Sequence, residues 1–280
     1  MNKIKGALWG VGQTVCAVAI VALLALSNHA EAAPKMGKGK KNDEGVATGF
    51  INKTLAVGGK PVRYVVYVPY GYDAGKAWPL IFFLHGAGER GDDGLVQTEV
   101  GIGSAIRRNP ERFPAVVVLP QCPKDGFYSG MLDEMEQMLA ETRAEYNIDD
   151  RRITLTGLSM GGYGTWLWGA AKADTFAALM PICGGGRADH LRAVGIGSDD
   201  LFGTFEERVA RWKDVPIWAF HGADDSVVPA SETVGTVEAI KAAGGKKVKF
   251  TEYPDTGHNS WDKTYQDKKV IAWLLKQKKD

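Results

Sequence analysis

Short apolar runs alternate along most of the chain with segments in which apolar residues recur every three or four positions. The runs are rich in β-branched and aromatic residues, as expected for buried strands. They predict seven strands, at residues 62–68, 80–85, 115–119, 153–156, 177–183, 215–221 and 248–253. The periodic segments predict helices at residues 131–146, 160–173, 231–243 and 263–276.

This alternation of strand and helix predicts an α/β fold, with a mostly parallel central sheet and helices on both faces. Catalytic and binding sites of such sheets lie at the carboxyl ends of the strands. No interior linker is visible, so residues 46–280 are expected to form a single domain. A glycine-rich, poorly periodic stretch at residues 184–205 is expected to be a loop or a small lid.

The first 45 residues have a different character. Lys3 and Lys5 precede an apolar run at residues 15–26, which is followed by Ala30-Glu31-Ala32. A basic start, a short apolar core and a small-residue cleavage site predict a secretory signal peptide at residues 1–32. Residues 33–45 then form a flexible tether, and the mature protein is secreted or periplasmic without stable membrane insertion. An uncleaved N-terminal anchor is the alternative.

Composition narrows the class of protein. The 280 residues are 45% hydrophobic and 24% charged, as in a globular protein, and 34 basic against 33 acidic residues give a net charge of +1. A chain so close to neutrality is not expected to bind nucleic acid. Cys16 leaves with the signal peptide, so Cys122 and Cys183 remain, and two cysteines do not make a disulfide scaffold. Both follow apolar runs, and they are either free or paired at one edge of the sheet.

The most informative local pattern is Gly157-Leu158-Ser159-Met160-Gly161, which matches Gly-x-Ser-x-Gly. It lies directly between the strand predicted at residues 153–156 and the helix predicted at residues 160–173. The bare pattern is only moderately specific in a chain with 35 glycines, so the strand–turn–helix setting carries the inference. That setting is the nucleophile elbow, a strained turn that exposes a reactive serine. Ser159 is the candidate nucleophile; the alternative is a glycine-rich turn without chemistry.

A serine hydroxyl needs a base to accept its proton, and the base is usually oriented by a carboxylate. Of the five histidines, His29 falls in the predicted signal peptide and His190 in the glycine-rich stretch. His85 and His221 each end a predicted strand and precede glycine, where a structural hydrogen bond is equally expected. His258 follows a predicted strand and also follows the candidate acids, as the chain order serine, acid, histidine requires. His258 is therefore the candidate base.

Two neighbouring carboxylates compete for the role of the acid. Asp224 and Asp225 both lie in the loop after the strand predicted at residues 215–221. One of them should orient His258, and the other should be solvated or cap the turn. Spacing alone does not separate them.

These motifs resemble those of a known superfamily, the α/β-hydrolases. Within it, the chain is similar to secreted esterases and "predicted peptidases". These are related to the phospholipase/carboxylesterase, dienelactone-hydrolase-like and feruloyl-esterase-like groups. The resemblance covers nearly all of residues 62–275 and is carried by motifs that stand in the order of the family. These are Leu84-His85-Gly86-Ala87-Gly88-Glu89-Arg90-Gly91, Leu119-Pro120-Gln121-Cys122-Pro123, Gly157-Leu158-Ser159-Met160-Gly161-Gly162, His221–Pro229 and Gly257-His258-Asn259-Ser260-Trp261-Asp262. The similar Gly-x-x-Asp-x-x-Val-Pro motif of the family implies that Asp225 is the acid.

Acyl transfer also needs two hydrogen-bond donors for the oxyanion. The backbone N–H after the nucleophile, that of Met160, is one candidate. The resemblance implies that the second is the Ala87 amide, with Gly86 and Gly88 letting the backbone approach the substrate; a plain strand-end turn is the alternative. Glu89 and Arg90 are expected to pair with each other or to steady this loop.

The same loop, from Gly86 to Gly91, also matches the Gly-x-Gly-x-x-Gly pattern of dinucleotide-binding turns. No apolar-periodic helix follows it, and no acidic residue ends a second strand about 20 residues later, so dinucleotide binding is not expected. No cysteine, histidine and carboxylate cluster has metal-ligand spacing. The sequence therefore predicts neither a metal nor another cofactor.

The resulting hypothesis is a serine carboxylic ester hydrolase with the α/β-hydrolase fold, acting through an acyl-enzyme. The resemblance implies small carboxylic esters or acyl and feruloyl groups on plant polysaccharide as substrates. Trp261, three residues after the candidate base, is a candidate substrate contact. The alternatives are a serine peptidase of the prolyl-oligopeptidase-like group and a non-catalytic binding module on the same scaffold. The sequence does not indicate the oligomeric state.

Overall fold

The computed structural model describes residues 45–58, 60–187 and 202–280. These residues belong to one compact unit, Lys38–Asp280. The predicted signal peptide at residues 1–32 and the predicted tether up to residue 44 lie outside the described residues, as does most of the glycine-rich stretch with His190. The signal peptide and the domain boundary at residue 46 therefore stay predictions.

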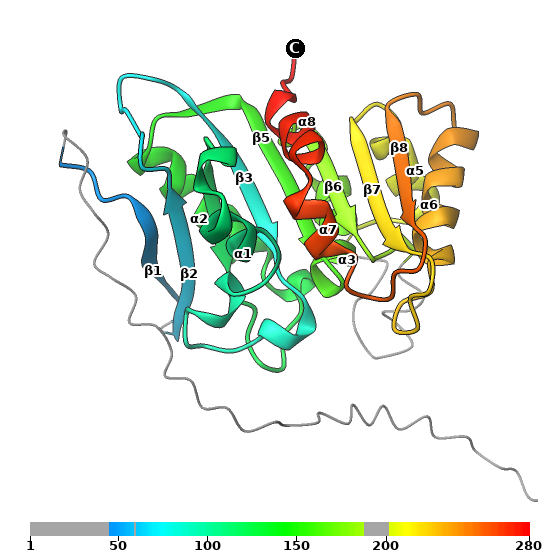
Figure 1. Ribbon diagram of the computed structural model, residues 1–280, viewed down its shortest axis with the longest axis horizontal. Helices are drawn as coiled ribbons and strands as arrows, with labels where there is room; N and C mark the ends of the chain where they lie inside the picture. The colour runs from blue at the N-terminus through cyan, green and yellow to red at the C-terminus, as the bar shows by residue number, and fades with distance from the viewer. Residues whose placement is uncertain (1–44, 59, 188–201) are drawn as a thin grey trace, which may run out of the picture. The chain divides into compact units, whose positions relative to one another are not determined.

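The centre of the fold is an eight-stranded sheet with the order β1-β2-β4-β3-β5-β6-β7-β8 (Figure 1). β1 pairs with β2, and β2 with β4, in antiparallel fashion, whereas all pairs from β4 to β8 are parallel. This mostly parallel sheet was predicted and is confirmed. The strands are β1 (Gly49–Val57), β2 (Lys60–Val68), β3 (Trp78–Leu84), β4 (Val116–Pro120), β5 (Ile148–Leu158), β6 (Ala178–Ile182), β7 (Ile217–Gly222) and β8 (Val248–Tyr253).

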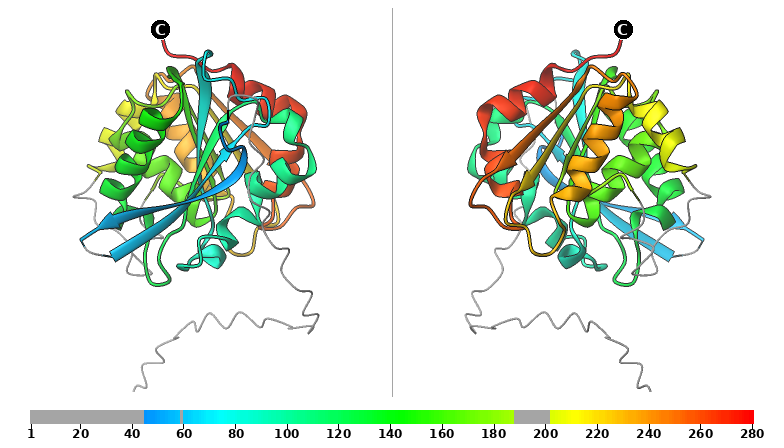
Figure 2. Two further views of the ribbon diagram at one scale, coloured as in Figure 1. Left: turned by 90° about the vertical axis from the view of Figure 1, so that its left-hand side faces the viewer. Right: turned by 90° about the vertical axis from the view of Figure 1, so that its right-hand side faces the viewer.

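Helices cover both faces of the sheet, as Figure 2 shows from its two edges. One face packs on α1 (Gly101–Arg108), α7 (Trp261–Gln266) and α8 (Lys268–Lys276), and the other on α2 (Leu132–Glu145), α3 (Met160–Ala171), α5 (Phe205–Trp212) and α6 (Ser231–Ala242). Short 3-10 helices complete the described elements: η1 (Ala87–Glu89), η2 (Val96–Thr98), η3 (Pro110–Arg112) and η4 (Tyr128–Gly130). The buried side chains accordingly form two large clusters separated by the sheet.

Three elements, β1, α1 and α5, were not predicted from the hydrophobic pattern. β1 is an edge strand with Asn52 and Thr54 exposed, so its apolar positions do not form a run. α1 and α5 are each eight residues long, which gives periodicity little length in which to appear. The helix predicted at residues 263–276 is two helices instead, because Asp267 leaves the helical conformation and its carboxylate accepts a hydrogen bond from the Lys269 amide, 2.8 Å away, at the start of α8.

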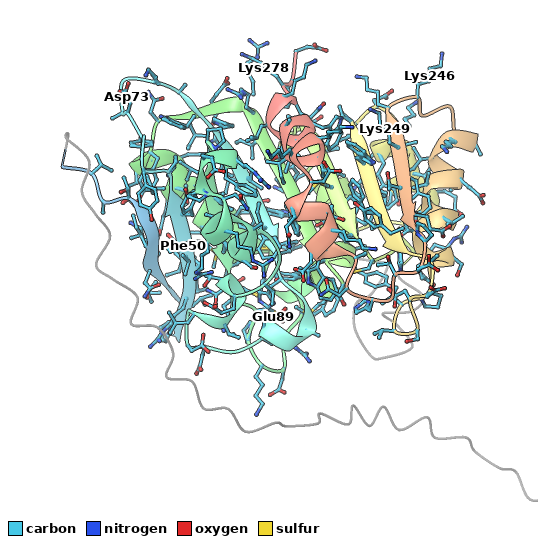
Figure 3. All side chains as sticks on the ribbon, in the orientation of Figure 1. Phe50, Asp73, Glu89, Lys246, Lys249 and Lys278 are labelled. Carbon is cyan, nitrogen blue, oxygen red and sulfur yellow. The ribbon has the colours of Figure 1, made fainter. Side chains whose placement is uncertain are left out.

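The carboxyl ends of the parallel strands all lie at the same end of the sheet, as the arrowheads in Figure 1 show. Glu89, in the loop after β3, lies at this end in Figure 3, whereas Asp73, Lys246 and Lys278 lie at the opposite end. The loops that carry Ser159, Asp225 and His258 follow β5, β7 and β8, so all three reach the same end. Within the residues that the structure describes, no helix has both the length and the apolar character needed to cross a membrane.

Candidate active site

Ser159 lies in a sharp turn between the last residue of β5 and the first of α3. Its backbone has φ 53° and ψ −117°, a left-handed conformation that is costly for a residue with a side chain. A Cβ at Gly157 would come within 2.3 Å of the Gly161 carbonyl oxygen, and a Cβ at Gly161 within 2.0 Å of the Leu84 carbonyl oxygen. The two glycines therefore permit a turn that holds the Ser159 hydroxyl above the end of the sheet.

The Ser159 hydroxyl is the first of three hydrogen-bonded side chains. Its Oγ atom lies 2.9 Å from Nε2 of His258, and Nδ1 of the same ring lies 2.7 Å from Oδ2 of Asp225. A carboxylate only accepts, so the Asp225 contact puts the hydrogen on Nδ1 and leaves Nε2 free to accept from the serine. The three residues come from loops after β5, β7 and β8. This geometry lets the Ser159 proton move to His258 as the oxygen attacks an electrophile.

Of the two competing aspartates, the structure brings Asp225 to His258. The other oxygen of Asp225, Oδ1, accepts hydrogen bonds from the amides of Val227 and Val228, each 2.9 Å away. Burial acts to raise the Asp225 pKa, but the hydrogen bonds from His258 and the two amides outweigh it and hold the pKa below its ordinary value. Asp224 is exposed, and its backbone amide donates to the Thr256 carbonyl, which joins the loop after β7 to the loop after β8.

His221 also contacts the candidate acid, which the sequence did not indicate. Its Nε2 atom lies 3.1 Å from Oδ2 of Asp225 and 2.9 Å from the Val228 carbonyl oxygen, while Nδ1 lies 2.7 Å from the Thr233 hydroxyl. Burial lowers the pKa of His221, and the bonds to Val228 and Asp225 oppose this. The only signal in the sequence was its position, at the end of a strand and before glycine, which a purely structural histidine also occupies.

The two candidate oxyanion donors lie beside Ser159. Met160 is the first residue of α3 and Ala87 the first of η1, positions whose amides have no partner within their own helix. No described residue accepts a hydrogen bond from either amide. A Cβ on Gly86 would lie 3.7 Å from Cβ of Ser159, so the loop after β3 packs directly against the nucleophile turn.

Glu89 and Arg90 both bond to the backbone of this loop. Glu89 accepts a 2.9 Å hydrogen bond from the Gly86 amide through Oε2, and Arg90 donates through Nε to the Ala87 carbonyl, 3.0 Å away. Of the two roles expected for them, these contacts match the steadying of the loop. Burial raises the Glu89 pKa, and hydrogen bonds from the Gly86 and Glu89 amides oppose the rise.

The two cysteines are buried and free, so the possible disulfide is not formed. They lie on opposite faces of the sheet, since Cys122 packs in one large cluster and Cys183 in the other. Sγ of Cys183 accepts a hydrogen bond from the Ser159 amide at 3.3 Å.

Ligand atoms of Cys183, Asp225 and His258 all lie within 4.8 Å of one another, and these residue types can hold zinc. Two of the three side chains are already engaged with one another, since Nδ1 of His258 bonds Oδ2 of Asp225 and Nε2 of the same ring bonds Ser159.

Trp261 begins α7 and packs its ring edge-on against His258, with ring centroids 5.4 Å apart. It is half-buried. Its contact with a substrate stays a prediction.

Comparisons with known proteins agree with this fold. A family profile described as phospholipase/carboxylesterase matches residues 201–272. The crystal structure of a thermostable esterase superposes with a TM-score of 0.69 and 34% identity, over 82% of this chain and 63% of that one.

Two curated proteins are also similar to this chain in sequence, at lower identity. The chain is 25% identical over 243 residues to a probable feruloyl esterase C of Aspergillus niger, covering 80% of this chain and 78% of that protein. It is 28% identical over 136 residues to endo-1,4-beta-xylanase Y of Acetivibrio thermocellus, of which it spans only 12%. The sheet topology and these similarities together assign the α/β-hydrolase fold to the chain, and the proteins it resembles include esterases.

Proposed function

We propose that this α/β-hydrolase is a secreted serine carboxylic ester hydrolase that works through an acyl-enzyme. The observation that carries the proposal is the continuous series of short contacts from Ser159 Oγ through His258 to Asp225, 2.9 and 2.7 Å long. Side chains in this order activate a hydroxyl that is a weak nucleophile when free. The similarity to esterases supports the choice of an ester over other electrophiles.

In the first half of the reaction, Ser159 Oγ attacks the ester carbonyl carbon while His258 Nε2 takes the serine proton. Asp225, held by the Val227 and Val228 amides, stabilises the imidazolium that forms. The carbonyl oxygen becomes an oxyanion, which the amides of Ala87 and Met160 bind. When the tetrahedral intermediate collapses, the C–O bond to the alcohol breaks and His258 returns the proton to the departing oxygen.

In the second half, water takes the place of the alcohol. His258 accepts a proton from the water as its oxygen attacks the acyl carbon, and a second tetrahedral intermediate forms with its oxyanion on the same two amides. Collapse of this intermediate breaks the bond to Ser159 Oγ, to which His258 gives the proton. The products are a carboxylic acid and an alcohol, and the three side chains return to their starting protonation states.

The substrates we propose are acyl and feruloyl esters, either small or attached to plant polysaccharide. The feruloyl esterase and xylanase among the similar proteins support this choice. The N-terminal pattern of Lys3, Lys5, an apolar run and Ala30-Glu31-Ala32 supports export, which would bring the enzyme to such a polymer.

The test is hydrolysis by the purified protein of p-nitrophenyl acetate, methyl ferulate and a dipeptidyl anilide. We expect both esters to be cleaved, and a fluorophosphonate probe to label the protein at Ser159. Ser159→Ala should abolish hydrolysis and labelling. Ser231→Ala is the matched control, because Ser231 is exposed at the start of α6, and it should leave both unchanged.

Cleavage of the anilide alone would favour a peptidase and overturn the ester proposal. A protein that cleaves nothing and does not react with the probe would contradict serine catalysis altogether.

A further inference from the structure

His85 is a buried histidine that the proposed reaction does not use, yet it lies beside the loop that supplies one of its hydrogen-bond donors. It follows β3 directly, and its side chain is 0% exposed. Nε2 of the ring lies 2.9 Å from the amide nitrogen of Cys122, and Nδ1 lies 2.6 Å from the carbonyl oxygen of Gly86. The ring thus bridges Cys122, two residues beyond the end of β4, and the backbone beside Ala87.

These two partners fix the position of the hydrogen on the ring. An amide N–H can only donate, so Nε2 accepts from Cys122 and carries no hydrogen. A neutral imidazole then has its single hydrogen on Nδ1, where it donates to the Gly86 carbonyl. Burial lowers the pKa of His85 to about 4, so the neutral ring is the form present near neutral pH. The tautomer is therefore set by the Cys122 amide.

The bond from His85 fixes the orientation of one peptide plane. The Gly86 carbonyl and the Ala87 N–H belong to the same planar trans peptide, in which the C=O and N–H point in opposite directions. Holding the carbonyl against Nδ1 therefore points the Ala87 N–H in the opposite direction, away from the His85 ring. As no described residue accepts a hydrogen bond from this N–H, it is left available to a ligand.

The preceding peptide plane, between His85 and Gly86, is held as well. The Tyr128 hydroxyl donates to the His85 carbonyl at 3.2 Å, and the Gly86 amide donates to Glu89 at 2.9 Å. Of the four polar groups on the two peptides, three are therefore bonded within the protein, and the fourth is the Ala87 N–H. A catalytic oxyanion site requires this arrangement, since its donors must be oriented before the charge develops.

We propose that His85 is a positioning residue for the oxyanion site: its Nδ1–H holds the Gly86 carbonyl so that the Ala87 N–H points at the developing oxyanion. The inference rests on the proposed acyl transfer and on Ala87 as a donor. His85 touches no reacting atom, and its effect is carried by the backbone alone.

Two substitutions separate this role from a structural one. In His85→Asn the side-chain NH2 can take the place of Nδ1–H and bond the Gly86 carbonyl, but nothing accepts from the Cys122 amide. In His85→Gln the longer side chain can accept from Cys122, but the Gly86 carbonyl keeps only the long 3.4 Å hydrogen bond from the Glu89 amide. Each variant loses one of the two hydrogen bonds, so comparable losses of stability are expected from both.

The experiment compares full-length wild type, His85→Asn and His85→Gln by ester kinetics, by inhibition with a trifluoromethyl ketone that forms a tetrahedral adduct on Ser159, and by urea denaturation. We expect His85→Gln to lower kcat about 10-fold to 100-fold with little change in KM, because an oxyanion contact is made only in the transition state. Its affinity for the ketone should fall by the same factor. His85→Asn should retain most of the activity.

Equal losses of kcat in both variants, or losses that follow stability alone, would overturn the inference. If wild type hydrolyses no ester, the proposed function fails, and the inference is then decided by two other readouts: the nitrogen NMR shifts of His85 and the rate at which the fluorophosphonate labels Ser159. A hydrogen on Nε2 in place of Nδ1, or equal labelling rates of the two variants, contradicts the inference.

Discussion

The Nε2 atom of His221 lies 3.1 Å from Oδ2 of Asp225, the same carboxylate oxygen that bonds Nδ1 of His258. Both groups that face this Nε2, the carboxylate and the Val228 carbonyl, are acceptors, so the hydrogen of the neutral ring sits on Nε2 and is shared between them. Nδ1 lies 2.7 Å from the Thr233 hydroxyl, whose single hydrogen can go either to this nitrogen or to the Gly184 carbonyl oxygen, also 2.7 Å away. Asp225 is thus fixed by two backbone amides on one oxygen and by two imidazole rings on the other.

This relationship predicts the behaviour of His221→Phe, which keeps a ring of similar size but removes both polar atoms. The buried Val228 carbonyl and Thr233 hydroxyl lose a partner, so we expect the free energy of unfolding to fall by about 1–3 kcal/mol. The His258–Asp225 bond remains, so kcat/KM should fall far less than in Asp225→Asn. Urea denaturation and ester hydrolysis measure the two effects. A variant as stable as wild type would contradict the bonding described here.

The two adjacent aspartates give a matched pair of variants. Asp225→Asn removes the charge that stabilises the His258 imidazolium, and its amide NH2 favours the wrong tautomer of the ring, so kcat/KM is expected to fall roughly 10²- to 10⁴-fold. Asp224 is exposed, and Asp224→Asn should change kcat/KM little. Steady-state kinetics on p-nitrophenyl acetate provides the measurement. Equal effects of the two substitutions would mean that Asp225 is not the acid.

Two glycines within helices are expected to respond in opposite directions to alanine. A Cβ on Gly161 would lie 2.0 Å from the Leu84 carbonyl oxygen, and backbone cannot move aside cheaply. Gly161→Ala should therefore lower the free energy of unfolding by about 3 kcal/mol or more. A Cβ on Gly235, in α6, would meet no atom of the described residues within 4 Å, so Gly235→Ala should raise stability by about 0.5–1 kcal/mol. Urea denaturation of both variants checks the contrast.

His85 makes the stability of the fold depend on pH. Its pKa is about 4 in the folded protein against an ordinary 6.5, so between these values the unfolded chain binds a proton that the native ring does not. The free energy of unfolding is therefore highest above pH 6.5 and declines as the pH falls towards 4, by about 3 kcal/mol from this group. The acid decline should be shallower in His85→Asn. Urea denaturation from pH 4 to 7 measures the free energy of unfolding of both proteins. The same pH dependence in wild type and His85→Asn would contradict this prediction.

The thiols of Cys122 and Cys183 are expected to be inert in the native protein. Both are 0% exposed, and burial raises the pKa of each to about 12, so neither access nor thiolate is available to an alkylating agent. Iodoacetamide followed by peptide mass mapping should find the two residues unmodified until urea is added. Rapid native labelling of either, or a peptide linked through both, would contradict the structure.

The order of strands and helices was available from the sequence because buried parallel strands are continuous apolar runs. The same is true of Ser159: a strand, a glycine-flanked serine and a helix are contiguous, so local spacing describes the turn. Elements that are stabilised by packing on other parts of the fold were not predicted. These are the edge strand β1 and the short helices α1 and α5. The break at Asp267 was missed because apolar periodicity continues across it.

Local sequence patterns were enough to predict the α/β architecture, the turn that carries Ser159 and the candidate partners of Ser159. The family resemblance pointed to Asp225, but its contact with His258, the second histidine on its carboxylate and the bond from His85 to the Gly86 carbonyl are visible only in the tertiary structure. Asp224 and Asp225 are adjacent residues of the same type, and His85-Gly86 and His221-Gly222 both follow a strand, so local sequence does not distinguish the members of either pair. They differ only in which direction the folded backbone points their side chains, and that direction is set by contacts between segments far apart in the chain.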